Sequence, residues 1–113
     1  MKILHNPRCR KSREGLQILE SSGKDFTIVE YLKEPLTQEE LNDVLSKLDM
    51  SAIELVRKNE KEWKENFKGK EMTEDEVIAA MADHPKLIER PIVISGDRAV
   101  VGRPPENIQQ LLD

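Results

Sequence analysis

The only cysteine of the chain, Cys9, lies within the segment 4–13, LHNPRCRKSR, which is also rich in positive charge. Residues 1–13 hold five basic side chains and no acidic one. The sequence predicts a short strand at 2–4, a turn at Asn6-Pro7 and a helix from Ser12 onward. Cys9 is therefore expected in a loop at a helix N-terminus.

This position favours a reactive thiol. Unpaired backbone amides and the helix dipole stabilise negative charge at a helix N-terminus, and nearby cations add to the effect. A free thiol has a pKa of about 8.5, which can fall to roughly 3.5–7.5 in such surroundings and yield the nucleophilic thiolate. The same amides can bind an oxyanion. Two other interpretations stay open: Cys9 as a small buried apolar residue, and the cations as a solvated face.

Composition narrows the class of protein. A chain of 113 residues is expected to form a single domain, 1–113, of an ordinary soluble globular protein. Its net charge of −4 argues against sequence-independent binding to nucleic acid or to an anionic membrane. One cysteine excludes an internal disulfide, and two histidines are too few for a metal site. With no apolar membrane span and no signal peptide in the sequence, we expect a cytoplasmic protein whose thiol stays reduced.

The predicted elements indicate an α/β fold that opens with a βαβ unit. A helix at about 12–22 ends at Gly23 and leads to a strand at 27–31. In such a unit the helix N-terminus follows the C-terminal end of the first strand. Cys9 should therefore lie at the sheet edge where open α/β folds bind ligands.

The rest of the chain completes a four-stranded mixed sheet. Capping signals of the form S/T-x-x-E predict a helical insertion at about 37–85, and they begin at Thr37, Ser51 and Thr73. Strands at 92–94 and 99–101 should form an antiparallel hairpin. A final helix is expected after the break at 102–106.

Five motifs in this order resemble the arsenate reductase (ArsC) family, whose members have a thioredoxin-like fold and depend on glutathione and glutaredoxin. The motifs are His5-Asn6-Pro7-Arg8-Cys9, Arg57-Lys58-Asn59, His84-Pro85 with Leu87-Ile88, Arg90-Pro91-Ile92-Val93 and Arg103-Pro104. The similarity runs from Ile3 to about Leu112.

The resemblance implies a role for each of seven residues. Cys9 matches the nucleophile, and the three arginines that hold the oxyanion are matched by Arg57, Arg90 and Arg103. His5 and Ser12 match neighbours of the thiolate, and Pro91 matches the proline that is cis in thioredoxin-like folds. Guanidinium groups suit arsenate because they bind tetrahedral anions through paired, charge-assisted hydrogen bonds.

The local sequence distinguishes Arg57 from the other two arginines. Arg57 could simply pair with a neighbouring acid such as Glu54 or Glu60. Arg90 and Arg103 each precede a proline next to a strand, where the backbone is held rigidly and a side chain can be aimed at a site.

The expected reaction is attack of the Cys9 thiolate on arsenate, followed by reduction to arsenite. No second cysteine exists to resolve the adduct, so an external thiol must supply reducing equivalents. The resemblance implies glutathione as co-substrate and glutaredoxin as partner, with no bound cofactor and no metal.

One departure from the family is the Arg10-Lys11 pair, where a Gly-Thr pair is common. These cations could strengthen anion binding, favour a larger anionic thiol or point to solvent. Two alternative functions also remain. One is a regulatory protein like Spx, which shares the fold and binds the RNA polymerase α subunit but often carries Cys-x-x-Cys, where this chain has Ser12. The other is a one-cysteine, glutathione-dependent thiol oxidoreductase acting on mixed disulfides.

Overall fold

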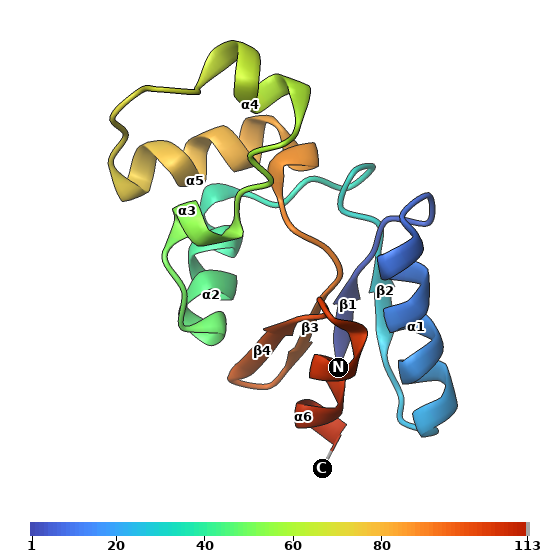
Figure 1. The fold of residues 1–113 in the computed structure, drawn as a ribbon. Coiled ribbons are helices and arrows are strands. Elements are labelled where there is room, and N and C mark those ends of the chain that lie inside the picture. The colour runs from blue at the N-terminus through green and yellow to red at the C-terminus, as the bar shows by residue number, and fades with distance from the viewer. Residues whose placement is uncertain (113) are drawn as a thin grey trace. The chain divides into compact units, whose positions relative to one another are not determined.

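The computed structural model describes residues 1–112, which form two compact units. The first unit combines residues 1–34 with the segment from Arg90 onward, and the second is Pro35–Glu89. Figure 1 shows the elements of both. The second range is close to the helical insertion expected at about 37–85, and the assignment of 1–113 to one domain stays a prediction. No helix among the described residues is long and apolar enough to cross a membrane.

The first unit is built on a four-stranded sheet in the order β2-β1-β3-β4 (Figure 1). The central strand β1 (Lys2–Leu4) pairs in parallel with β2 (Thr27–Val29) and antiparallel with β3 (Ile92–Ser95). β3 also pairs antiparallel with β4 (Arg98–Val101). The predicted α/β class and the mixed four-stranded sheet are confirmed.

Three helical segments complete the first unit: α1 (Arg10–Ser22), the 3-10 helix η2 (Pro105–Ile108) and α6 (Gln109–Leu112). A core of buried apolar side chains joins sheet and helices, and it consists of Ile3, Leu19, Val93, Ile108 and Leu111. Ile3 and Val93 lie opposite each other on paired strands. Full burial of one such side chain stabilises the fold by roughly 1.5–3 kcal/mol, so this cluster fixes α1 against the sheet.

Several boundaries differ from the sequence-based predictions, and the strands predicted at 92–94 and 99–101 are each one residue longer. α1 begins at Arg10 rather than Ser12, because Cys9 already accepts the first helical hydrogen bond, from the Arg13 amide at 3.0 Å. β2 ends at Val29 rather than residue 31, because the chain turns at Glu30, whose carbonyl oxygen accepts the amides of two later residues. The final helix starts as 3-10 turns and becomes α-helical only at Gln109.

The first unit also contains a close approach between α1 and Pro91. A Cβ atom on Gly15 would lie 2.8 Å from Pro91 Cγ and 3.0 Å from Ile108 Cδ1. A Cβ atom on Gly102 would lie 2.9 Å from the same Pro91 atom. The Arg90–Pro91 peptide is cis, as the family resemblance predicted. The proline ring therefore packs against two positions that have no room for a side chain, and α1 is held close to the start of β3.

The second unit is helical. Its elements are α2 (Gln38–Leu48), α3 (Ala52–Leu55), α4 (Lys61–Asn66), α5 (Glu74–Asp83) and the 3-10 helix η1 (Pro85–Leu87). The capping boxes predicted at Thr37 and Thr73 are confirmed. The helix start predicted at Ser51 is confirmed, since Ser51 is the N-cap of α3, although its side chain makes no capping bond. The Ala52 amide at the first position of α3 donates to the Glu74 carboxylate, at 2.9 and 3.1 Å from its two oxygens, which ties the start of α3 to α5.

Gly15→Ala should destabilise the protein by about 1 kcal/mol or more. Overpacking of a filled core costs roughly 1–3 kcal/mol, which outweighs the gain of up to about 1 kcal/mol from replacing glycine within a helix. Urea denaturation measures the free energy of unfolding. Gln17→Ala, at an exposed position of the same helix, is the control and should stay within about 0.5 kcal/mol of wild type. A Gly15→Ala variant more stable than wild type would contradict this prediction and show that Pro91 can shift to make room for the added methyl group.

Candidate active site

The loop between β1 and α1 places Cys9 at the N-cap of α1, as predicted. The buried residue Asn6 shapes this loop. Its carbonyl oxygen accepts the Cys9 amide at 3.0 Å, and its side-chain Oδ1 accepts the Arg8 amide at 3.0 Å. An asparagine that bonds the backbone two residues further on mimics a turn, so Asn6 sets the path of the chain into the cysteine.

Two buried polar side chains, His5 and Ser12, hold this loop to α1. Ser12 Oγ accepts the Asn6 amide at 3.0 Å and lies 2.7 Å from His5 Nδ1. Burial lowers the pKa of His5, and this effect outweighs the opposing influence of Glu30 and of Ser12. His5 is therefore neutral at pH 7, and its ring and the Ser12 hydroxyl share a single hydrogen bond.

The thiol of Cys9 is half-buried and has a lowered pKa. Burial alone would raise this pKa, because it removes water from the charged form. The Ser12 amide, the Arg90 side chain and the Lys11 amide all stabilise the thiolate, and together they outweigh the burial. Ser12 thus stabilises the thiolate through its backbone amide, while its hydroxyl bonds His5 and Asn6.

Two of the three predicted arginines lie at the Cys9 sulfur. Arg103 Nη2 is 3.5 Å from Cys9 Sγ, and Arg103 Nε donates to the carbonyl oxygen of Arg90 at 2.8 Å. The Arg90 guanidinium interacts with both the Cys9 sulfur and the Tyr31 phenol, and these contacts raise its pKa although burial opposes them. Two arginine side chains thus bring positive charge to the thiolate.

The hairpin of β3 and β4 brings these two arginines together. Arg90 lies just before β3 and Arg103 just after β4, and the Gly102 amide donates to the Pro91 carbonyl oxygen at 2.8 Å. The pairing therefore continues past the ends of both strands. The Arg103–Pro104 peptide is cis as well as Arg90–Pro91, which the sequence analysis did not anticipate.

The third predicted arginine, Arg57, belongs to the second unit. Its amide donates to the Leu87 carbonyl oxygen at 2.7 Å, which holds the backbone beside the residues after α5. Its side chain pairs with two carboxylates, from Nε to Glu60 and from Nη1 to Glu89, each at 3.4 Å. The pairing with Glu60 is one that the sequence suggested. A role for Arg57 in oxyanion binding stays a prediction.

Comparison with known proteins agrees with this geometry, since the model of the ArsC family matches residues 4–111. The chain belongs to the ArsC family. Its thioredoxin-like fold is shared with related solved structures, among them arsenate reductase from Vibrio cholerae, with a TM-score of 0.91 and 39% identity over 97% of each chain.

Related sequences match along nearly the whole chain. The Escherichia coli K12 protein YfgD, described as uncharacterized, is 45% identical over 99% of this chain and 96% of that protein. The arsenate reductase of Neisseria meningitidis serogroup A is 43% identical over 99% of this chain and 97% of that protein. The ArsC-family assignment thus covers both units.

The two cations that depart from the ArsC-family pattern share one acid on the surface of α1. Arg10 Nε lies 3.2 Å and Lys11 Nζ 3.7 Å from the Glu14 carboxylate, with side chains that are 84% and 47% exposed. Arg13 is also engaged, since its guanidinium donates to the Pro7 carbonyl oxygen at 3.0 Å. These contacts favour the solvated-face reading for Arg10 and Lys11.

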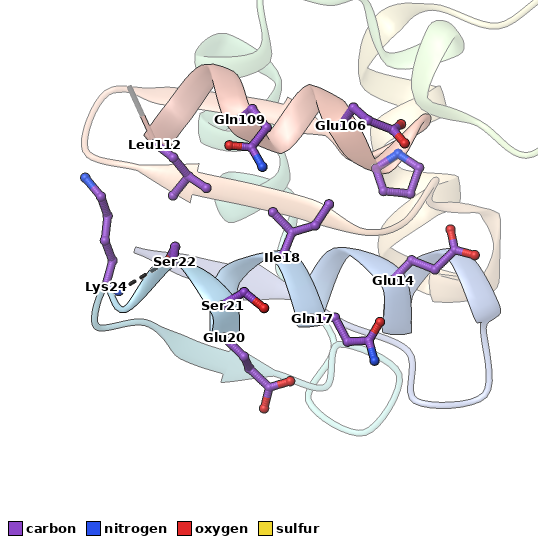
Figure 2. Close-up of a pocket in the computed structure, with 11 residues that line it drawn as sticks. Glu14, Gln17, Ile18, Glu20, Ser21, Ser22, Lys24, Glu106, Gln109 and Leu112 are labelled. Atoms are coloured by element: carbon purple, nitrogen blue, oxygen red, sulfur yellow. Dashed lines mark hydrogen bonds between the residues drawn. The ribbon is translucent and has the colours of Figure 1, made fainter.

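A broad groove runs along α1 in the first unit (Figure 2). Its walls come from α1 on one side and from η2 and α6 on the other, including Gln17, Ile18, Glu106 and Gln109. Cys9 and the two arginines at the sulfur do not line it. The Cys9 thiol at the N-terminal end of α1 is therefore not part of this groove.

Two residues at this site had no predicted role in it. Asn6 was placed in a turn and in a family motif, and the structure adds that its side chain organises the cysteine loop. Tyr31 was read as a strand residue, yet it is fully buried and interacts with Arg90. Its place at the C-terminal end of a strand, at the edge where ligands bind, was the available signal.

The lowered thiol pKa predicts that iodoacetamide alkylates Cys9 with a midpoint below that of a free thiol. Arg90→Gln removes a cation that stabilises the thiolate, so the midpoint should rise by about one pH unit. Mass spectrometry reads the reaction directly, because the chain has one cysteine. Arg98→Gln, an exposed arginine of β4, is the control and should leave the midpoint unchanged. Equal midpoints for wild type and Arg90→Gln would contradict the assigned contact.

Ser12→Ala should lower the free energy of unfolding by roughly 1–3 kcal/mol, because it leaves the buried Asn6 amide without its acceptor. Ser22→Ala, which removes the less buried hydroxyl that donates to Leu19 at the other end of α1, should cost about 1 kcal/mol or less. Thermal or urea denaturation compares the two. A smaller loss for Ser12→Ala than for Ser22→Ala would refute the structural role of this hydroxyl.

Proposed function

We propose that this protein reduces arsenate to arsenite, with the Cys9 thiolate as nucleophile and glutathione and glutaredoxin as the source of electrons. The observation that carries the proposal is the half-buried Cys9 sulfur, which lies against the guanidinium groups of Arg90 and Arg103 and has a lowered pKa. Membership of the ArsC family and 43% identity to the Neisseria meningitidis arsenate reductase support it.

The charge at the sulfur suits an anionic substrate. A thiolate and arsenate are both anions and repel each other, so an attack requires positively charged groups close to both of them. Preorganised guanidinium groups provide it without moving during the reaction, which is the main way enzymes stabilise charge in a transition state. In this proposal Arg90 and Arg103 each face the thiolate and the incoming oxyanion, and Arg57 is a further oxyanion ligand by family resemblance.

The first step forms a sulfur–arsenic bond from Cys9 to arsenic, and an arsenate oxygen leaves as water after taking up protons. A thiol then provides the second sulfur. Overall, two thiols lose two electrons and two protons and form one disulfide, while arsenic(V) becomes arsenic(III) and one oxygen is released as water. The chain holds one cysteine, so at least one of these thiols comes from another molecule. Glutathione and glutaredoxin fill that role here.

The test is arsenate-dependent oxidation of NADPH, coupled through glutathione, glutathione reductase and glutaredoxin. Wild type should turn over, and Cys9→Ser should lose at least about a thousandfold in kcat because the nucleophile is gone. Arg98→Gln should keep wild-type activity. A Cys9→Ser variant as active as wild type would rule out Cys9 as the nucleophile.

The same assay separates the alternatives. Turnover of a glutathionylated peptide without any response to arsenate would identify a one-cysteine thiol oxidoreductase. No activity on either substrate, together with capture by the C-terminal domain of the RNA polymerase α subunit, would identify a regulatory protein like Spx.

A further inference from the structure

We propose that Tyr31 is a positioning residue for the active site: its phenol orients the Arg90 guanidinium toward the Cys9 thiolate and the incoming oxyanion. The catalytic part of this inference rests on the proposed function. The effect on the thiolate does not, because it concerns only the contacts among these three side chains.

The strand order brings Tyr31 to the site although it is distant in sequence from Arg90. β1 lies between β2 and β3, and the His5 amide donates to the Val29 carbonyl oxygen at 2.9 Å, directly beyond the paired residues of β1 and β2. Tyr31 follows two residues later. On the other side of β1, Leu4 pairs with Ile92, so Arg90 also lies at this edge. The cysteine loop starts from the same edge.

Burial makes the contact between Tyr31 and Arg90 specific. Tyr31 is 0% exposed, and neither its hydroxyl oxygen nor Arg90 Nε is accessible to solvent. A buried phenol hydroxyl and a buried guanidinium Nε both need polar partners, because water cannot reach them. Arg90 interacts with the Tyr31 phenol and with the Cys9 sulfur. The guanidinium is planar with its N–H groups in a fixed fork, so a partner on one side determines where the others point.

Tyr31 contacts the side chain of Arg90, whereas Arg103 contacts its main chain. Arg103 Nε bonds the backbone carbonyl oxygen of Arg90, which fixes the main chain and leaves the long side chain to be held elsewhere. Before the oxyanion arrives, a neutral phenol can hold the guanidinium without cancelling its charge. A carboxylate in this place would compete with the substrate and weaken the positive field at the sulfur.

The experiment compares Tyr31→Phe with wild type in two assays. Tyr31→Phe keeps the ring and removes only the hydroxyl. In the alkylation assay with iodoacetamide, the midpoint for Cys9 should move to higher pH, by less than in Arg90→Gln. In the coupled arsenate assay, kcat/KM should fall by roughly three- to tenfold, mainly through KM, as expected for loss of one hydrogen bond that holds a binding group.

A double-mutant comparison distinguishes positioning from a general structural effect. Once Arg90 is replaced by Gln, removal of the Tyr31 hydroxyl should cause no further change in midpoint or in kcat/KM. Additive effects in Tyr31→Phe/Arg90→Gln would overturn the proposal, as would a folded Tyr31→Phe protein identical to wild type in both assays. Phe26→Leu, which loosens packing against the core of the same unit, should lower the thermal midpoint and leave the alkylation profile unchanged.

A second probe covers the case in which Tyr31→Phe does not fold. Tyr31 is the only tyrosine, so growth on 3-fluorotyrosine labels this position alone. Fluorine withdraws electron density from the phenol oxygen and weakens it as an acceptor, so the alkylation midpoint should rise slightly. An unchanged midpoint would count against the proposal. A shifted midpoint in a protein that does not reduce arsenate would retain Tyr31 as a positioning residue and reject the proposed function.

Discussion

The balance between burial and charge at the Cys9 sulfur is the constraint on which the site depends. Burial shields the thiol from water and by itself makes the thiolate less stable. The Ser12 amide and the Arg90 guanidinium reverse this effect only because they reach the sulfur directly. A more exposed thiol would be screened from its partners by water, and a more buried one without arginines would stay protonated. Reactivity therefore requires the loop, the helix and the arginines together.

The sheet satisfies this requirement through the order of its strands. The cysteine loop follows the central strand β1. Tyr31 follows the neighbouring strand β2 and Arg90 precedes the neighbouring strand β3, so all three lie at the same edge of the sheet. β4 adds Arg103 through its pairing with β3. Below this edge, Pro91 packs against Gly15 and Gly102, so the helix and the hairpin cannot approach without a clash or separate without leaving a cavity. The packing under the site thus sets the distances within it.

Local sequence was sufficient for much of the fold and for the nucleophile. The capping boxes at Thr37 and Thr73, the left-handed glycine after α1 and the hairpin at 92–101 each follow from short-range rules, and all are present in the structure. Where a distant partner decides a contact, local sequence was not sufficient. Ser51 is the N-cap of α3 as its pattern predicted, but its side chain makes no capping bond, and the first amide of the helix, from Ala52, bonds Glu74 of another helix.

The same distinction holds for the site. Cys9 could be identified from its neighbours, and the positions of Arg90 and Arg103 from their prolines and from the family resemblance. Tyr31 could not, because its importance comes from a contact with Arg90, which lies across the sheet and far along the chain. The family resemblance placed Ser12 beside the thiolate, but it did not show that the backbone amide acts on the sulfur while the hydroxyl bonds Asn6 and His5.

The first unit is discontinuous in sequence, and this has a consequence for how the protein is made. Cys9 leaves the ribosome early, but Arg90 and Arg103 follow only after the whole segment 35–89. Until they arrive, the nascent chain carries an ordinary thiol with a pKa of about 8.5, which is mostly protonated in a neutral cell and reacts slowly. The Arg90 contact, which helps to lower this pKa, can form only after the last two strands have been made and have paired.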